Sequence, residues 1–149
     1  MITGIDHAPQ NGVEIEKLEA GCLVRLYKNV KEETDAEGNV KMVADVVETV
    51  FPVEIAVENI VAHFDTYFNE AREKEVKEWK QKPEFLPKLL KEIADTDYHL
   101  FKFMDGKITA EEYEPWKTYR ENLRVAIRAM EKAESVEELK QVVVPVKPA

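Results

Sequence analysis

The sequence predicts an α+β fold in which a small three-stranded antiparallel sheet is packed by one long helix and followed by a helical C-terminal module. Apolar and polar residues alternate between residues 13 and 50, which is typical of half-buried strands. From residue 55 onward, apolar residues recur at three- and four-residue spacing, as on one face of a helix. Pro83 and Pro87 interrupt that spacing, so we expect one module over 1–82 and a second over 83–149.

The three strands are expected over 13–16, 22–30 and 40–50, joined as a meander through turns at Gly21 and Gly38. A sheet this small needs a helix on its apolar face to be stable. Alternation places Val24, Leu26 and Val30 on one face of the second strand, and Met42, Ala44 and Val46 on one face of the third.

The helix expected on the sheet runs from Ile55 to about Lys80, and its apolar stripe thins beyond Ala71. The second half is mostly charged, with Val76 and Trp79 as its remaining apolar residues. It either projects as a solvated arm or pairs its opposite charges at four-residue spacing, and we favour a solvated helix. An exposed Val76/Trp79 stripe would allow two chains to pair, or it would pack on the C-terminal helices.

The C-terminal module is expected to contain four helices. A short one begins near Leu86, and Asp95 or Asp97 caps the next, over 98–104. Thr109-Ala-Glu-Glu112 and Ser135-Val-Glu-Glu138 are capping boxes, in which Ser or Thr accepts from a backbone N–H and the Glu reaches back. Pro115 falls one turn into the third helix, where it either kinks or restarts it.

Composition excludes several classes of function. The 149 residues carry a formal net charge of −9, which argues against binding nucleic acid because a duplex repels an acidic surface. Cys22 is the only cysteine, so neither an internal disulfide nor a cysteine-based zinc site is possible. The sequence shows no signal peptide and no apolar run of membrane-spanning length, so we expect a cytoplasmic protein that does not enter a membrane.

The sequence contains no recognisable catalytic or cofactor motif. His7, His63 and His99 lack partners at metal-ligand spacing, and no glycine-rich phosphate loop or nucleophile elbow is present. Glu111 and Glu112 are adjacent carboxylates, but helix capping explains them. We therefore expect a protein that is not an enzyme and requires no metal or organic cofactor.

One helical stripe admits two interpretations. Trp116, Tyr119, Leu123 and Ile127 recur at the spacing of a buried helix face, and this interpretation is favoured, with Trp116 and Leu123 in the core. Arg120 and Arg124 would then be an exposed pair, met by Glu121 or Asp97. The alternative is a recognition face, since Trp, Tyr and Arg are enriched in binding hot spots.

The stretch from Ile93 to Ile127 also resembles a known family. It reads Ile-Ala-Asp-Thr-Asp-Tyr98, a turn at Asp105-Gly106, Thr109-Ala-Glu-Glu-Tyr113, Trp116, Tyr119-Arg120 and Leu123-Arg124. This order is similar to the C-terminal helical region of bacteriophage tail fibre assembly proteins and tail assembly chaperone-like proteins. The similarity covers roughly a quarter of the chain, and residues 1–82 do not match that pattern. The matching positions are Tyr98, Trp116, Tyr119, Arg120, Leu123 and Arg124.

The resemblance implies a non-enzymatic phage or prophage protein that binds a tail component and helps it fold or assemble. The alternative is a structural tail or baseplate accessory that stays in the virion. The partner is then a phage tail protein, the location is the cytoplasm of a bacterial host or the virion, and a homo-oligomer remains open. The residues expected to bind the partner are Tyr98, Trp116, Tyr119, Arg120 and Arg124.

Overall fold

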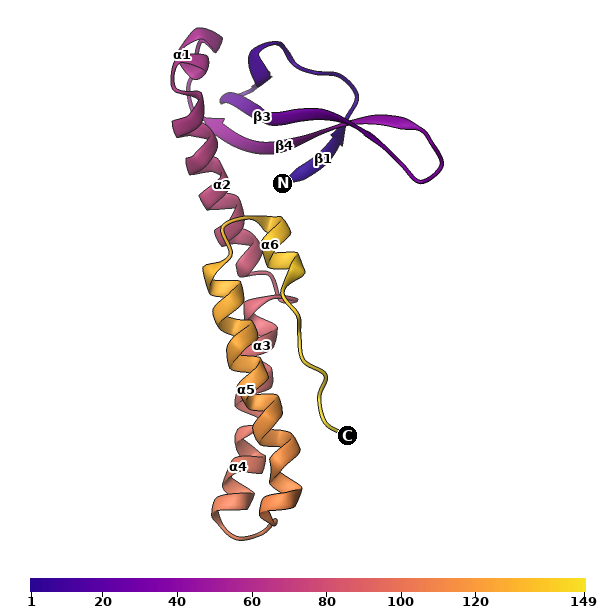
Figure 1. The fold of residues 1–149 in the computed structure, drawn as a ribbon. Helices are drawn as coiled ribbons and strands as arrows, with labels where there is room; N and C mark the ends of the chain where they lie inside the picture. The colour runs from indigo at the N-terminus through magenta and orange to yellow at the C-terminus, as the bar shows by residue number, and fades with distance from the viewer. The chain divides into compact units, whose positions relative to one another are not determined.

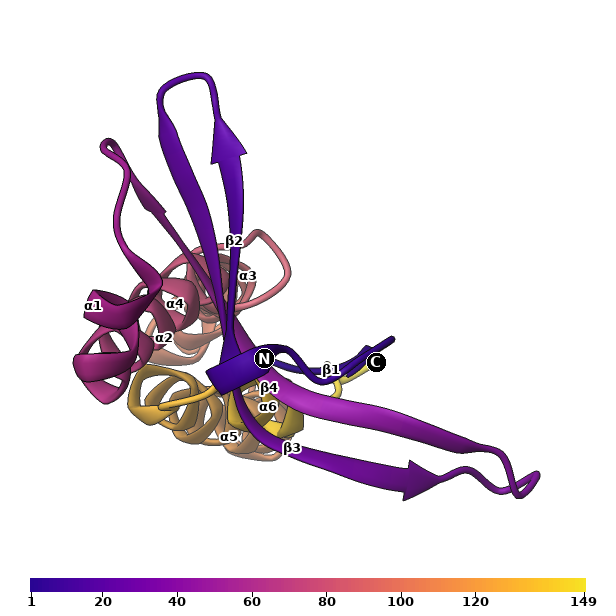
Figure 2. The same ribbon diagram turned by 90° about the horizontal axis from the view of Figure 1, so that it is seen from above.

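The computed structural model describes residues 1–149 and confirms the α+β class (Figures 1 and 2). The chain forms two compact units, Met1–Glu75 and Val76–Ala149. The boundary falls inside helix α2 (Phe64–Lys80), so this helix contributes residues to both units. The expected division at 82/83 instead lies in the turn after α2.

The first unit contains a four-stranded antiparallel sheet, not the three-stranded sheet expected. Strands β2 (Val13–Leu18), β3 (Gly21–Thr34) and β4 (Val40–Phe51) follow the predicted meander, with a short 3₁₀ turn η1 (Gln10–Gly12) before β2. Strand β1 (Ile2–Ile5) was missed, and it pairs with β4 at the sheet edge in the order β1-β4-β3-β2. Four residues with little alternation carry no periodic signal, so β1 depends on its pairing with β4.

The core face of the sheet is set by the register between β3 and β4. Leu26 pairs with Val47, so Val47 joins Cys22, Val24 and Leu26 in the core. The face formed by Met42, Ala44 and Val46 is therefore the opposite one, because side chains alternate along a strand.

Val30 was expected to share the face of Val24 and Leu26, but it is exposed. The β3–β4 register shifts between Lys28 and Lys31, and Asn29 there adopts a left-handed φ of 55°. Such an irregularity changes the direction of the side chains that follow it. Beyond this point the β3–β4 hairpin extends as an arm, visible in Figure 2, and most of its residues are exposed.

The expected long helix is divided into α1 (Val57–Ala62) and α2 by His63, whose ψ of 28° is not helical. Ile60 from α1, with Phe68 and Ala71 from α2, covers the core face of the sheet. Arg72 extends from α2 to Asp45 of β4 and forms an ion pair with it. This ion pair neutralises Asp45, the one carboxylate of β4 on the sheet face that the helices cover.

The second unit contains α3 (Leu86–Asp95), α4 (Asp97–Met104), α5 (Ala110–Lys132) and α6 (Val136–Gln141). Figure 1 shows α3 and α4 running antiparallel to α5, with the chain after α6 extended alongside. No helix in the structure has the length and apolar character that crossing a membrane requires. The core of the second unit contains Leu86, Leu89, Tyr119, Leu123, Ala126, Met130, Ala133 and Leu139.

The last part of α2 packs in this second core, so the prediction of a solvated helix is wrong there. Val76 is buried, and Trp79 packs against the core cluster and meets the Phe85 ring at 5.8 Å. An exposed Val76/Trp79 stripe was the observation that favoured pairing of two chains. Because these residues are covered within the unit, that support for a homo-oligomer is lost.

The helix starts show which local signals held. Thr109 caps α5 with both bonds of the predicted capping box, and α5 continues through Pro115 as one helix. The Ser135 side chain accepts from Glu138 N–H, but the Glu138 carboxylate accepts from Glu134 N–H. Neither aspartate caps α4, because Thr96 occupies that position and its hydroxyl donates to Ile93 C=O.

Candidate protein-binding site

Five residues were predicted to form a protein-binding site, and the α4–α5 hairpin places them on different surfaces. Tyr98 lies on the solvent side of α4, whereas Trp116, Tyr119, Arg120 and Arg124 come from α5. Leu123, on the same helix, is fully buried, which confirms the prediction for that residue. The remaining positions separate into an aromatic cluster on one flank of the hairpin and a cationic pocket on the other.

The aromatic cluster consists of Tyr98, His99, Trp116 and Tyr119. The His99 ring stacks on Trp116 with centroids 3.5 Å apart and an interplanar angle of 10°, and Tyr98 meets the edge of His99. Trp116 is half-buried and packs against the core cluster of the second unit, so the prediction that it is a buried core residue holds only in part. Burial against Trp116 lowers the pKa of His99, and the nearby Lys102 and Lys147 act in the same direction.

Tyr119 is buried between α5 and α3. Its hydroxyl donates a 2.7 Å hydrogen bond to the Glu92 carboxylate, and burial together with this bond raises the pKa of Tyr119 to about 12. A buried hydroxyl that already donates to a carboxylate contributes to helix packing. Tyr119 is therefore a structural residue in this conformation, not an accessible contact.

Arg120 was expected to be exposed, but only 7% of its surface is accessible. Its Nη1 donates to the Thr96 hydroxyl at 2.6 Å, to Asp97 at 2.6 Å and to Ile93 C=O at 3.3 Å. The arginine thereby ties the α3–α4 junction to α5, and it shares Ile93 C=O near the C-terminal end of α3 with the Thr96 hydroxyl. Asp97 is one of the two partners that the sequence suggested for the arginine pair.

Arg124 is one turn further along α5, and it pairs with Glu121 at 2.9 Å, the other suggested partner. Arg120 and Arg124 line the same pocket of about 220 Å³. Lys117 is the third cation of the pocket, and it was not among the predicted site residues. The helical spacing of residues 113, 117, 120 and 124, at intervals of four, three and four, could have predicted it. Leu100, Tyr113 and Glu121 form the remaining walls.

Helix α4, which contributes Leu100 to this pocket, also carries exposed apolar side chains. Met104 follows the lining residue Leu100 by four positions and is 71% exposed, while Phe101 is 59% exposed. Tyr98 is 59% exposed on the flank of the aromatic cluster, and the Lys102 ammonium lies 4.4 Å from its ring centroid. Large exposed apolar side chains beside polar groups are typical of protein-interaction surfaces.

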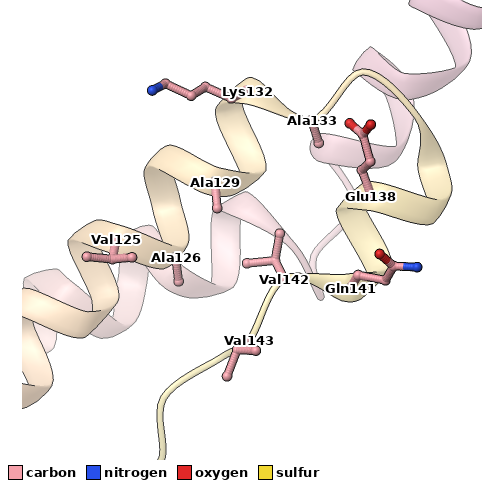
Figure 3. Close-up of a pocket in the computed structure, with 9 residues that line it drawn as sticks. All are labelled: Val125, Ala126, Ala129, Lys132, Ala133, Glu138, Gln141, Val142 and Val143. Carbon is pink, nitrogen blue, oxygen red and sulfur yellow. The ribbon is translucent and has the colours of Figure 1, made fainter.

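Two other concavities are less suited to recognition. A groove of about 430 Å³ lies between α5 and α6 and is lined mainly by alanines, valines and aliphatic stems, as Figure 3 shows. Nothing in it is aimed at a polar ligand: Lys132, Glu138 and Gln141 lie at its edges.

A polar depression of about 370 Å³ lies on the sheet of the first unit. Its charges satisfy one another, since Arg25 donates to Glu48 at 2.8 Å and to Glu16 at 3.1 Å, and Tyr27 donates to Glu14 at 2.7 Å. Burial and that hydrogen bond raise the pKa of Tyr27 to about 12. The structure assembles no group of three His, Cys, Asp or Glu side chains suited to hold a metal ion.

Comparison of the chain with known protein families, curated proteins and solved structures finds no match.

Proposed function

We propose that this protein acts without catalysis, by binding another protein through the surface formed by α4 and the adjoining flank of α5. The observation that carries the proposal is that α4, which contributes Leu100 to the Lys117/Arg120/Arg124 pocket, also exposes Phe101 and Met104. Tyr98 is exposed as well, on the flank of the aromatic cluster. Aromatic residues, methionine and arginine are the residue types enriched at protein interfaces. Arg124 remains a candidate contact, whereas Tyr119 and most of Arg120 contribute as support.

The proposed partner is a bacteriophage tail component, and the proposed role is to assist its assembly. This part of the proposal is supported by the resemblance of residues 93–127 to tail fibre assembly proteins. A structural accessory retained in the tail or baseplate would use the same binding surface. Mass spectrometry of purified particles separates the two roles, because an assembly helper is absent from the finished particle.

The test is co-expression with the tail genes that neighbour its own gene, followed by capture. Phe101→Ser combined with Met104→Ser removes these two apolar side chains without touching the core. Val143→Ser combined with Val146→Ser is the matched control, since both valines are exposed and lie in the extended C-terminal segment. We expect the first pair to lose most of the captured tail protein and the control to keep it, with unchanged melting curves. Equal capture by both would refute the proposed surface.

A further inference from the structure

The guanidinium of Arg120 presents one unused edge. All of its hydrogen bonds leave from Nη1, toward three acceptors on α3 and α4. No buried side-chain nitrogen or oxygen in the protein lacks a hydrogen-bond partner, so Nε and Nη2 must retain surface. Since Arg120 lines the cationic pocket, that surface is available there.

The geometry of this edge matches one ligand chemistry. Nε and Nη2 carry parallel N–H groups at the spacing of the two oxygens of a carboxylate, which favours a bidentate contact. The two hydrogens of Nη1 are shared among its three acceptors and hold the guanidinium plane in place, so little conformational freedom is lost when the edge is used. Lys117 and Arg124 add positive charge, and each pairs with a single carboxylate: Glu114 at 3.9 Å, and Glu121, which also lines the pocket, at 2.9 Å.

We propose that this pocket receives an aspartate or glutamate side chain of the partner protein, on a segment whose apolar residues cover Phe101 and Met104. The inference rests on the proposed function and specifies the partner's chemistry. Local charge supports it, because three cations and one carboxylate, Glu121, line a pocket of a chain whose net charge is −9. A side chain within an amphipathic segment fits better than a chain end, since α4, which contributes to the pocket, also exposes apolar side chains that a continuing segment would cover.

The direct test uses three synthetic helical peptides and the full-length protein with ¹⁵N-labelled arginine. The first peptide is amidated and carries one glutamate between leucines spaced for a helix. The second replaces that glutamate by glutamine, and the third has the glutamine but a free terminal carboxylate. We expect a saturable shift of the Arg120 Nε–H resonance with the first peptide and about tenfold weaker binding of the second, a difference of about 1.4 kcal/mol. Equal binding of the first two, or tightest binding of the third, would overturn the proposal.

Charge reversal supplies a second test that does not depend on the buried arginine. Lys117→Glu and Lys91→Glu change the net charge equally, but Lys91 is an exposed residue of α3 that does not line the pocket. We expect Lys117→Glu to weaken the glutamate peptide about tenfold and Lys91→Glu to leave it nearly unchanged. Arg120→Lys retains charge but loses the fork, and it is to be compared only if its melting curve shows a folded protein. Identical peptide binding by the two glutamate variants would refute the pocket.

Capture of tail proteins separates this inference from the proposed function. If the wild-type protein captures no tail component but binds the glutamate peptide selectively, the phage role fails and the carboxylate site stands. If the wild-type protein, the Lys117→Glu variant and the Lys91→Glu variant all capture a tail component equally well, the carboxylate site fails and the phage role stands.

Discussion

Leu123 gives the sharpest test of how the second unit is held together. It is 0% exposed and belongs to the same core cluster as Leu89, Tyr119 and Met130. Leu123→Ala removes three buried carbon groups, which lose about 2.4 kcal/mol at roughly 0.8 kcal/mol each. The cavity left behind adds to this loss, so we expect the free energy of unfolding to fall by about 3–4 kcal/mol.

Urea unfolding followed by tryptophan fluorescence measures the effect in the right place, because Trp79 and Trp116 both lie in the second unit. At a denaturant dependence of roughly 1 kcal/mol per molar urea, the midpoint should fall by about 3 M. If that leaves the variant unfolded in water, Leu123→Val removes one group and should cost roughly 1 kcal/mol.

Leu90→Ala is the matched control, since Leu90 lies on α3 but is 52% exposed. Its midpoint should move by less than a third of the Leu123→Ala shift, because much of the removed surface was already in water. Equal midpoints for Leu123→Ala and Leu90→Ala, with unchanged urea dependence, would show that Leu123 is not in a packed core. The α3–α5 packing described above would then be wrong.

Three further predictions test local features. Thr109→Ala should cost the second unit about 1 kcal/mol by removing the α5 cap, whereas Thr118→Ala, an exposed position within α5, should leave its urea midpoint unchanged or slightly higher. Gly21→Ala should destabilise the sheet by more than Gly38→Ala, as measured by amide hydrogen exchange: both have positive φ, but only at Gly21 would the added Cβ come within 1.9 Å of Phe51 O. Tyr119→Phe and Tyr27→Phe should each abolish one tyrosinate absorbance step near pH 12. Because folding raises these two pKa values, the stability that the hydroxyls contribute should persist below a pH of about 10 and be lost as the pH rises toward 12. Absorbance steps that survive both substitutions would refute the assignments.

Hydrophobic periodicity and helix-capping motifs predicted most of the strands and helices. Alternation located β2, β3 and β4, and three- and four-residue spacing located the helices, because both patterns reflect burial along a single element. The Thr109 capping box needs only residues three apart, so it formed as predicted. The core position of Leu123 follows from the same spacing.

Other features depend on residues that are distant in the sequence. Strand β1 depends on β4 some 40 residues later, and the core face of β4 depends on its register with β3. The charged residues around Val76 and Trp79 in the sequence fit an exposed helix and a packed helix equally well. Only the contacts with the core of the second unit show that this part of α2 is packed.

The candidate site shows the same division. Residue type and spacing proposed Arg120 and Arg124, the family resemblance added Tyr98, and Asp97 and Glu121 are the ion-pair partners that the sequence suggested for the two arginines. The burial of Arg120 was not predictable, because an arginine on the flank of a helix becomes buried only where acceptors surround it. Here Thr96, Asp97 and Ile93 C=O come from the α3–α4 junction, more than twenty residues earlier in the chain. The sequence by itself determined the helices and their apolar stripes, since local spacing encodes them. Only the tertiary structure decided which arginine nitrogens are used, because their hydrogen-bond partners come from another helix.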